Sequence, residues 1–266
     1  MEQTPTPGQG LGLSGNVLFY QAPEPLNVQM HGSLGVNRID KPYRFVAQTN
    51  VVPLTVMEFA AAALSYPVIF VGENKTPLAV MGLRQGENLF VNGDGDFRVD
   101  AYIPGFVRRY PFVFANDDES KRLVLCIDRS APFISDKPDV PFFEGDQPSQ
   151  YVQTAMQFCN DFEAERRRTD AFVDVLKELD LFESREATYA PNSPEGVQGE
   201  PVTLATYFAV SNEKLNALPA EKFVELRDNG ALAQIYAHQV SLLGWDKLIA
   251  IAIERASKEQ PAAANA

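Results

Sequence analysis

The segment PVIFVGENKTPLAVMGL, residues 67–83, predicts the type of strand pairing in this chain. Two short apolar runs, 67–71 and 77–83, flank a polar turn at 73–76. Strands joined by so short a connection pair antiparallel, because a parallel crossover needs about a dozen residues or more. The stretch therefore predicts a β-hairpin, and similar spacing elsewhere favours an antiparallel meander over a parallel sheet.

The remainder of the first half is also predicted to be rich in strands. Alternating residues predict a strand at 43–47, and the apolar run 123–127 predicts another. Residues 89–99 carry a strong turn signal in their middle and read as a second hairpin. One helix is expected within 53–64, beginning at a proline.

The second half is predicted to be mainly helical. Apolar residues at helical spacing indicate a long helix over 147–179. Pro219 is expected at the first position of another helix, which ends at Asn229-Gly230. A last helical region, 232–254, is expected to bend at Gly244.

Two other segments complete the predicted fold. Residues 206–210 are expected to return one strand to the sheet, and 185–201 are expected to form a surface loop. The predicted fold class is α+β, with an antiparallel β-rich N-terminal half packed with a helical C-terminal half. We expect one domain over 26–258, with flexible segments at 1–25 and 259–266.

Composition excludes several function classes. The chain has 266 residues and a formal net charge of −12, a charge that repels phosphate backbones and anionic lipid surfaces. It has neither a signal-peptide pattern nor an apolar stretch long enough to span a membrane. Cys126 and Cys159 are expected to be small buried hydrophobic residues in a reducing compartment. We therefore expect a cytoplasmic protein without nucleic-acid binding or membrane insertion.

No motif indicates catalysis, a metal or a cofactor. The only two histidines, His31 and His238, lie in no metal-ligand spacing. Nucleophile-elbow and Walker patterns are absent, and the glycine-rich start of the chain does not follow a strand. We therefore predict no catalytic residues, metal or cofactor, and we favour a non-catalytic protein over an enzyme.

The stretch 102–112, YIPGFVRRYPF, places two arginines among aromatic residues in an otherwise acidic chain. Arginine side chains bind carboxylates with two hydrogen bonds and stack on rings. One interpretation is a pocket wall for an anionic or aromatic ligand; the other, which we favour, is internal ion pairs with aromatic packing. The candidate ligand-binding residues of this stretch are Tyr102, Arg108, Arg109, Tyr110 and Phe112.

A second candidate is one face of the last helical region, where polar and aromatic residues recur every three or four positions. His238, Ser241 and Trp245 lie on this face. A shared hydrogen bond between His238 and Ser241 carries no catalytic meaning without an acid and an oxyanion hole. A structural histidine between helix and sheet is therefore the favoured interpretation, while His238 and Trp245 stay ligand-binding candidates.

Several of these stretches, taken together and in order over about residues 30–250, resemble the SapC-like bacterial proteins. The residues that carry the resemblance include Tyr66-Pro67-Val68-Ile69-Phe70, Arg108-Arg109-Tyr110-Pro111-Phe112, Leu125-Cys126-Ile127-Asp128 and Ile235-Tyr236-Ala237-His238. One departure is Phe97, where such proteins often have tryptophan.

The resemblance implies a role related to surface layers or secretion, and it supplies no catalytic residues. Relatives are often encoded near cupin-like proteins, halogenase-like flavoproteins and outer-membrane uptake receptors, which are the protein partners it implies. Three hypotheses follow: a cytoplasmic accessory or binding protein, a small-molecule sensor or enzyme with a pocket at the arginine block, and a structural surface-layer component. We favour the first, because no catalytic motif is present.

Overall fold

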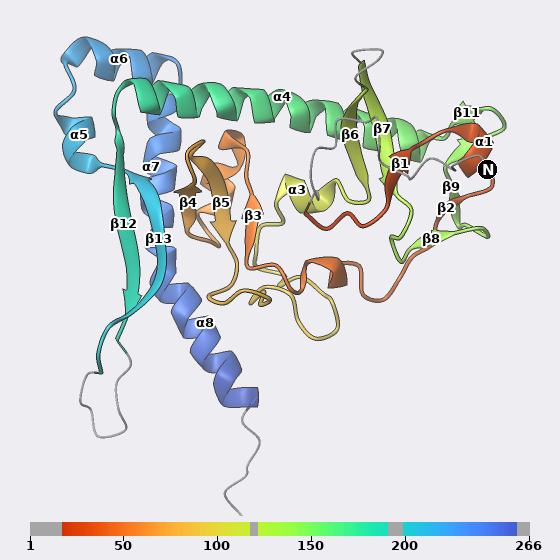
Figure 1. Cartoon of the computed structure of the whole chain (residues 1–266), viewed down its shortest axis with the longest axis horizontal. Coiled ribbons are helices and arrows are strands. Elements are labelled where there is room, and N and C mark those ends of the chain that lie inside the picture. Colours follow the sequence, from red (N-terminus) through yellow and green to blue (C-terminus); the bar gives the residue numbers. More distant parts are fainter. Residues whose placement is uncertain (1–17, 118–121, 191–198, 260–266) are drawn as a thin grey trace, which may run out of the picture. The chain divides into compact units, whose positions relative to one another are not determined.

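The computed structural model describes residues 18–117, 122–190 and 199–259, which group into two compact units (Figure 1). Unit 1 comprises the described residues of Met1–Val46, Asp94–Asp96 and Phe106–Ala164, and unit 2 comprises those of Ala47–Gly93, Phe97–Gly105 and Glu165–Ala266. Residues 1–17 and 260–266 of the two predicted flexible segments lie outside the described residues. A single domain over 26–258 stays a prediction.

Unit 1 contains two small antiparallel sheets and a hairpin. The first sheet has the order β1-β7-β6, and its strands are Pro23–Pro25, Arg122–Asp128 and Phe112–Asp117. The second has the order β8-β2-β9, with strands Ile134–Ser135, Gly35–Val36 and Val140–Pro141. The hairpin pairs β10 (Phe143–Glu144) with β11 (Gln147–Pro148). All these pairs are antiparallel, as predicted.

The core of unit 1 lies between β6 and β7 and the first part of helix α4 (Gln150–Glu178). Phe112 and Ile127 of the strands pack with Val152 and Cys159 of the helix, and all four are buried. The predicted strand at 123–127 and the long predicted helix are confirmed. The remaining helices of this part are α1 (Val28–His31) and α3 (Gly105–Arg108).

The predicted strand at 43–47 is wrong, because Arg44–Val46 forms a 3₁₀ turn. The Val46 amide donates to the carbonyl of Tyr43 at 3.0 Å, and the Tyr43 amide donates to the carbonyl of Gly95 at 3.0 Å. Val46 is fully buried in this turn. The burial of Val46, which the alternating pattern led us to expect from a strand, is therefore achieved by a 3₁₀ turn.

Unit 2 contains a five-stranded antiparallel sheet in the order β12-β13-β4-β5-β3. Its strands, in that order, are Phe182–Tyr189, Val202–Val210, Val68–Val71, Thr76–Val80 and Val51–Pro53. The hairpin predicted from residues 67–83 is confirmed as β4 and β5, with Val71 paired to Thr76. Gly72 has a φ of +69° in the turn between these strands, a conformation that glycine adopts without strain.

Two predictions about strands in unit 2 need correction. Residues 185–189, predicted to be part of a loop, form the second half of β12, and 191–198 lie outside the described residues. Ser184, Arg185 and Glu186 of β12 are all exposed, so the strand lacks the alternation of buried and exposed residues that would identify it from the sequence. The predicted hairpin at 89–99 is reduced to one bridge, between Val91 and Phe97. The predicted strand at 206–210 is confirmed within β13.

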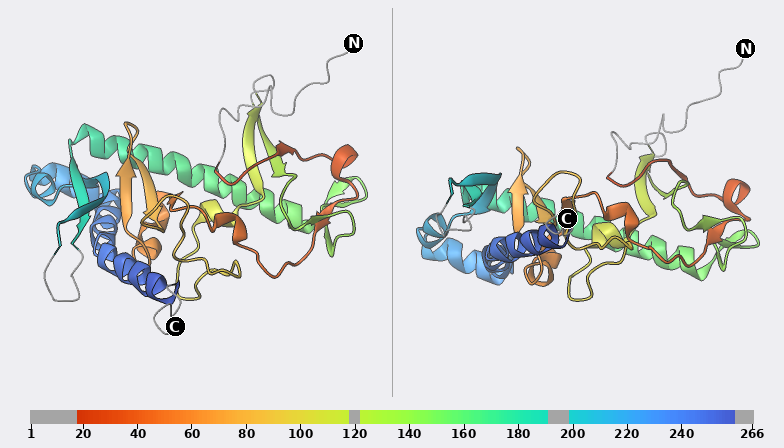
Figure 2. Two further views of the ribbon diagram at one scale, coloured as in Figure 1. Left: turned by 60° about the horizontal axis from the view of Figure 1, so that its bottom comes forward. Right: turned by 90° about the horizontal axis from the view of Figure 1, so that it is seen from below.

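The helices predicted for unit 2 are present, but Pro53 ends β3 and does not open the first of them, and α5 was not predicted. The helices of this unit are α2 (Phe59–Ala62), the end of α4, α5 (Asn212–Asn216), α6 (Ala220–Asp228), α7 (Ala231–Ser241) and α8 (Gly244–Glu259). The predicted bend at Gly244 is confirmed as a break, and Figure 2 shows α7 and α8 as two successive blue helices. A side chain at Gly244 would lie 3.2 Å from the backbone nitrogen of Pro67, so glycine permits this close approach.

The α+β fold class is confirmed, with a strand-rich N-terminal half and a helical C-terminus. Among the described helices, none combines the length and the apolar character needed to cross a bilayer.

Candidate ligand pocket

The seven predicted ligand-binding residues are divided between the two units. Unit 1 contains Arg108, Arg109, Tyr110 and Phe112, whereas unit 2 contains the other three, Tyr102, His238 and Trp245. Each group is therefore considered within its own unit.

Arg109 is a buried side chain surrounded by aromatic rings. Only 8% of the residue is exposed, and its guanidinium carbon lies 4.2 Å from the ring centre of Phe106 and 4.6 Å from that of Phe162. One guanidinium nitrogen lies 3.8 Å from a carboxylate oxygen of Glu163. Nε of Arg109 has no hydrogen-bond partner among the described residues. This geometry matches the favoured structural interpretation of the arginine, an ion pair with aromatic packing.

Arg108 and Phe112 lie on either side of this cluster in the sequence and have different environments. Arg108 is exposed, with its guanidinium carbon 5.2 Å from the ring centre of Phe158 on α4. Phe112 is 3% exposed and packs edge-to-face against Phe142 and Tyr151. Phe112 is therefore a core residue of unit 1.

Tyr110 is held by rings on several sides. It stacks on Phe45 with 4.1 Å between ring centres, and it meets Tyr20 and Phe133 edge-to-face at 5.2 and 5.7 Å. Its hydroxyl donates a hydrogen bond to Oδ2 of Asp128 at 3.2 Å. Burial raises the pKa of Tyr110 well above its ordinary value, so the phenol stays protonated and keeps this donor.

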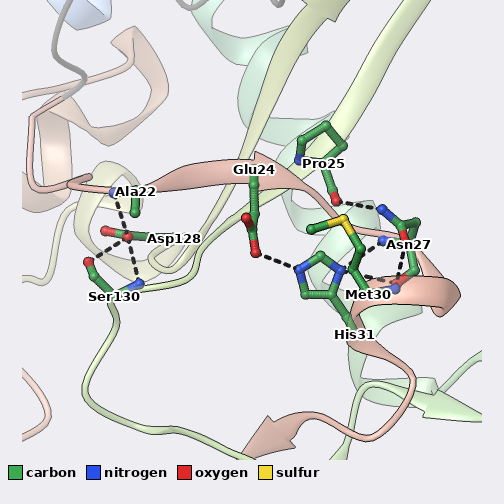
Figure 3. A network of polar contacts seen from close by, with 8 residues as sticks. All are labelled: Ala22, Glu24, Pro25, Asn27, Met30, His31, Asp128 and Ser130. Atoms are coloured by element: carbon green, nitrogen blue, oxygen red, sulfur yellow. Dashed lines mark hydrogen bonds and ion pairs between the residues drawn. The ribbon is translucent and has the colours of Figure 1, made fainter. Parts of the chain in front are cut away.

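Asp128 is the polar centre of unit 1. It is fully buried, and its oxygens accept hydrogen bonds from the backbone amide of Ala22 and from the amide and hydroxyl of Ser130 (Figure 3). The backbone amide of Gln21 donates a further hydrogen bond to Asp128. Burial alone raises the pKa of a carboxyl, but here the hydrogen bonds from Ser130 and from the backbone amides of Gln21 and Ala22 together have a larger effect than burial. They hold the pKa of Asp128 below its ordinary value. Asp128 is therefore a charged anchor for the segment that leads into β1.

Figure 3 also shows the second buried polar contact of this region, between His31 and Glu24. His31 is 1% exposed, and its Nε2 lies 2.9 Å from Oε1 of Glu24. Its Nδ1 lies within hydrogen-bond distance of the backbone of Asn27. The sequence contains no motif or spacing that predicts a contact between His31 and Glu24.

An open pocket of about 510 Å³ lies beside Tyr110 in unit 1. Three aromatic and three charged side chains line it, namely Tyr110, Phe133, Tyr151, Arg38, Asp40 and Asp96. Tyr151 is fixed by the core, because it stacks on Phe142 and contacts Phe112 edge-to-face. Of the predicted candidates in this unit, only Tyr110 lines the pocket.

Sequence reasoning missed Arg38, Asp40, Phe133 and Tyr151 as pocket residues. They come from separate loops and from the start of α4, with no common spacing. Asp96 belonged to a segment interpreted only as a turn. No local signal identifies such residues, because the pocket is formed by tertiary contacts.

Tyr102 belongs to a buried network in unit 2 centred on Glu58. The Glu58 carboxylate accepts hydrogen bonds from the Tyr102 hydroxyl at 2.9 Å, from the Gly105 amide at 2.6 Å and from Thr55. The Tyr66 hydroxyl donates to the backbone carbonyl of Tyr102. Since its hydroxyl and its carbonyl are both engaged, Tyr102 fixes the loop that precedes α3.

His238 joins α7 to the sheet of unit 2. It is fully buried, its Nε2 accepts from the Val210 amide at 3.1 Å, and its Nδ1 donates to the Val68 carbonyl at 2.9 Å. Burial lowers the pKa of His238 to about 4, so the imidazole is neutral near pH 7. The Ser241 hydroxyl donates to the backbone carbonyl of His238, not to its ring. This geometry is that of a structural histidine between helix and sheet.

Trp245 lies at the start of α8 and is 9% exposed. Its ring centre lies 5.7 Å from that of Tyr207 on β13. The contact attaches α8 to the sheet of unit 2.

The buried polar clusters around Asp128 and Glu58 make their hydrogen bonds within their own units, and Tyr110 is the predicted site residue of unit 1 that lines the open pocket. Within the described ranges, no group of three or more His, Cys, Asp or Glu side chains is arranged to hold a metal ion. The fold and the pocket define a mixed α+β protein with an aromatic, charged cavity. A family model described as SapC matches residues 26–248, most of the sequence, and the chain therefore belongs to the SapC family. Comparisons with curated proteins and with solved structures gave no match.

Proposed function

We propose that this SapC-family chain is a non-catalytic binding protein, and that the pocket beside Tyr110 is its ligand site. The observation that carries the proposal is the pocket itself, a cavity of about 510 Å³ lined by Tyr110, Phe133 and Tyr151. This volume is within the range of small-molecule sites, about 300–1,000 Å³. Core contacts of Tyr110 and Tyr151 hold two of these rings in place before any ligand arrives, which reduces the entropy lost on binding.

The charges of the pocket favour a cationic ligand. Its charged residues are Arg38, Asp40 and Asp96, two carboxylates against one guanidinium. Aromatic faces attract organic cations through their quadrupoles. The two arginines that motivated an anionic ligand, Arg108 and Arg109, do not line the pocket. A small organic cation with an apolar or aromatic body fits these groups better than an anion.

Isothermal titration with a matched pair of probes tests the proposal. We expect 2-phenylethylammonium to bind more tightly than 3-phenylpropanoate, which has a similar body and the opposite charge. Asp40→Asn is expected to lower the affinity for the ammonium probe by about fivefold, as expected for a partly exposed charge pair. Asp136→Asn, an exposed carboxylate of unit 1 outside the pocket, is the matched control. Equal binding of both probes, or no effect of Asp40→Asn, contradicts the proposed site.

A second candidate function, as accessory to a partner protein, is favoured by the outer face of α7. Residues 231–241 contain no Asp, Glu, Lys or Arg, in a chain with 22% charged residues. Tyr236 and Val240 on this helix are 45% and 57% exposed, and Leu243 just beyond it is 77% exposed. Their spacing of four and three places them on one side of the helix. An uncharged, apolar helical surface on a partner is complementary to this face.

Co-expression with the products of neighbouring genes tests this second function. Val240→Asp is expected to abolish co-purification with a cupin-like, halogenase-like or uptake-receptor partner. Val224→Asp, on the exposed side of α6, is the matched control. If the purified protein forms dimers that Val240→Asp dissociates, the face of α7 binds a second copy of this chain instead of a partner protein.

We also propose that the protein acts in the bacterial cytoplasm. Cys126 and Cys159 are buried free thiols, which is typical of a reducing compartment. Fractionation of the native host tests this location, and recovery of the chain outside the cell contradicts it.

A further inference from the structure

Strand β12 forms one edge of the five-stranded sheet of unit 2 (Figure 1). Of the strands that the structure describes, only β13 pairs with it. Ser184, Arg185 and Glu186 in the middle of β12 are exposed. An edge strand presents backbone amides and carbonyls to which a further strand can bind. The direction of each backbone group therefore decides which residues of β12 can pair with such a strand.

The pairing with β13 shows which backbone groups of β12 point away from the sheet. Phe182 lies opposite Val210, and the Ser211 amide donates to the Leu181 carbonyl at 2.8 Å. Phe182 therefore belongs to a non-hydrogen-bonded pair, and its own amide and carbonyl point away from β13. The Lys214 ammonium donates to this carbonyl at 2.9 Å, which agrees with that direction. By alternation along the strand, the outward backbone groups are those of residues 182, 184 and 186.

Charged side chains lie on either side of Ser184. Glu183 and Arg185 point to the same face of the sheet, because they are two positions apart, and their carboxylate and guanidinium lie 2.6 Å apart. Charges on an edge strand oppose pairing with an arbitrary strand. They favour a strand whose charges are complementary in the same register.

A second copy of β12 is complementary in the register centred on Ser184. When two identical strands pair antiparallel about a two-fold axis, one residue faces its own copy. With Ser184 at that position, Glu183 of each copy faces Arg185 of the other, so two pairs of unlike charges form. Placing Glu183, Arg185 or Glu186 there instead brings like charges directly opposite each other. The same register joins the outward backbone groups of residues 182, 184 and 186.

We propose that the protein forms a homodimer in which β12 pairs antiparallel with β12 of a second copy, centred on Ser184. Ser184 exchanges two backbone hydrogen bonds with its own copy, and Phe182 of each chain exchanges two with Glu186 of the other. The Phe182 carbonyl has two lone pairs, so it accepts from Lys214 and from the second copy together. The sheets of the two copies become continuous. This interface involves neither the Tyr110 pocket nor the face of α7, and it does not depend on the functions proposed for them.

Sedimentation velocity of the full chain at increasing protein concentration tests the inference, and we expect a monomer–dimer equilibrium. Arg185→Glu places carboxylates opposite each other twice and is expected to weaken the dimer about tenfold. Combining Arg185→Glu with Glu183→Arg exchanges the two charges, which restores unlike pairs and is expected to recover the dimer. The matched control is Arg227→Glu, at an exposed arginine of α6 that pairs with Asp228 at 2.7 Å, and it is expected to dimerise like wild type.

Hydrogen exchange of the wild-type chain keeps the test decisive if these variants fold poorly. The outward amides of Ser184 and Glu186 are expected to exchange rapidly in dilute protein and slowly in concentrated protein. The amide of Arg185, which points toward β13, should exchange slowly in both.

Val240→Asp distinguishes this interface from the exposed face of α7, and we expect it to leave the dimer intact. A wild-type chain that is monomeric at every concentration overturns the inference and leaves the edge to a strand of another protein. A dimer that Arg185→Glu does not weaken, or that Val240→Asp dissociates, also overturns it.

Discussion

The guanidinium of Arg109 lies 3.8 Å from the Glu163 carboxylate in the interior of unit 1, and neither side chain is more than 15% exposed. A buried pair of this kind contributes little compared with an apolar pair of the same shape, but losing one partner is costly. The guanidinium also fills the space between the rings of Phe106 and Phe162. Arg109 therefore stabilises unit 1 through both charge and packing.

Arg109→Ala is expected to lower the free energy of unfolding by about 3 kcal/mol. The substitution removes a charge partner of Glu163 and leaves a cavity between two rings. Urea unfolding followed by circular dichroism measures the change. Arg108→Ala is the control, since Arg108 is exposed, and we expect a change within about 0.5 kcal/mol. If Arg109→Ala leaves the urea midpoint unchanged and abolishes ligand binding, Arg109 is a ligand contact instead.

Asp128→Asn is expected to destabilise the protein by about 2 kcal/mol near neutral pH, because an amide cannot accept all the hydrogen bonds that the carboxylate accepts. The folded-state pKa of Asp128 lies below the ordinary value of about 3.9. Its contribution is therefore complete above that value and is lost as the pH falls through the folded-state pKa. Unfolding measured between pH 2 and 7 checks both parts. Wild type and variant should converge in stability at the acid end, and a constant difference at every pH contradicts the charged anchor.

The buried His238 is expected to make the stability of the protein depend on pH in a second range, above the one in which Asp128 acts. The pKa of His238 is lowered by burial to about 4 in the folded protein, whereas an unfolded histidine titrates near 6.5. The unfolded chain therefore binds more protons between these values, so the stabilisation is complete above pH 6.5 and is lost as the pH falls toward 4. The difference corresponds to about 3 kcal/mol. In His238→Gln this part of the pH dependence should disappear, while Tyr236→Gln, an exposed residue of the same helix, should keep it.

The two thiols are expected to be unreactive in the folded protein. Burial raises the pKa of Cys126 and of Cys159 to about 11, so the thiolate fraction at pH 8 is very small. A disulfide reagent such as DTNB should detect neither thiol in the native protein and both in guanidinium chloride. Rapid modification of either thiol under native conditions contradicts the buried environment.

Local sequence signals were sufficient for much of the fold. The hairpin over 67–83, the long helix α4 and the break at Gly244 each rest on short-range chemistry: a turn between two apolar runs, helical periodicity, and a glycine. The edge strand β12 could not be identified in this way, because its outward polar residues read as a loop. The structure of 43–47 was also not predicted correctly, because its alternating residues form a 3₁₀ turn and not a strand.

The α+β class, the antiparallel pairing and the arginines among aromatic residues can be predicted from the sequence, because they depend on neighbours a few positions apart. Which of those residues share an environment depends on the tertiary structure. It placed Arg109 against Glu163, 54 positions further along the chain, and it placed Tyr110 beside Asp128 and the pocket residue Arg38. Burial and distance between such residues are set by packing of the whole unit, so no local pattern specifies them.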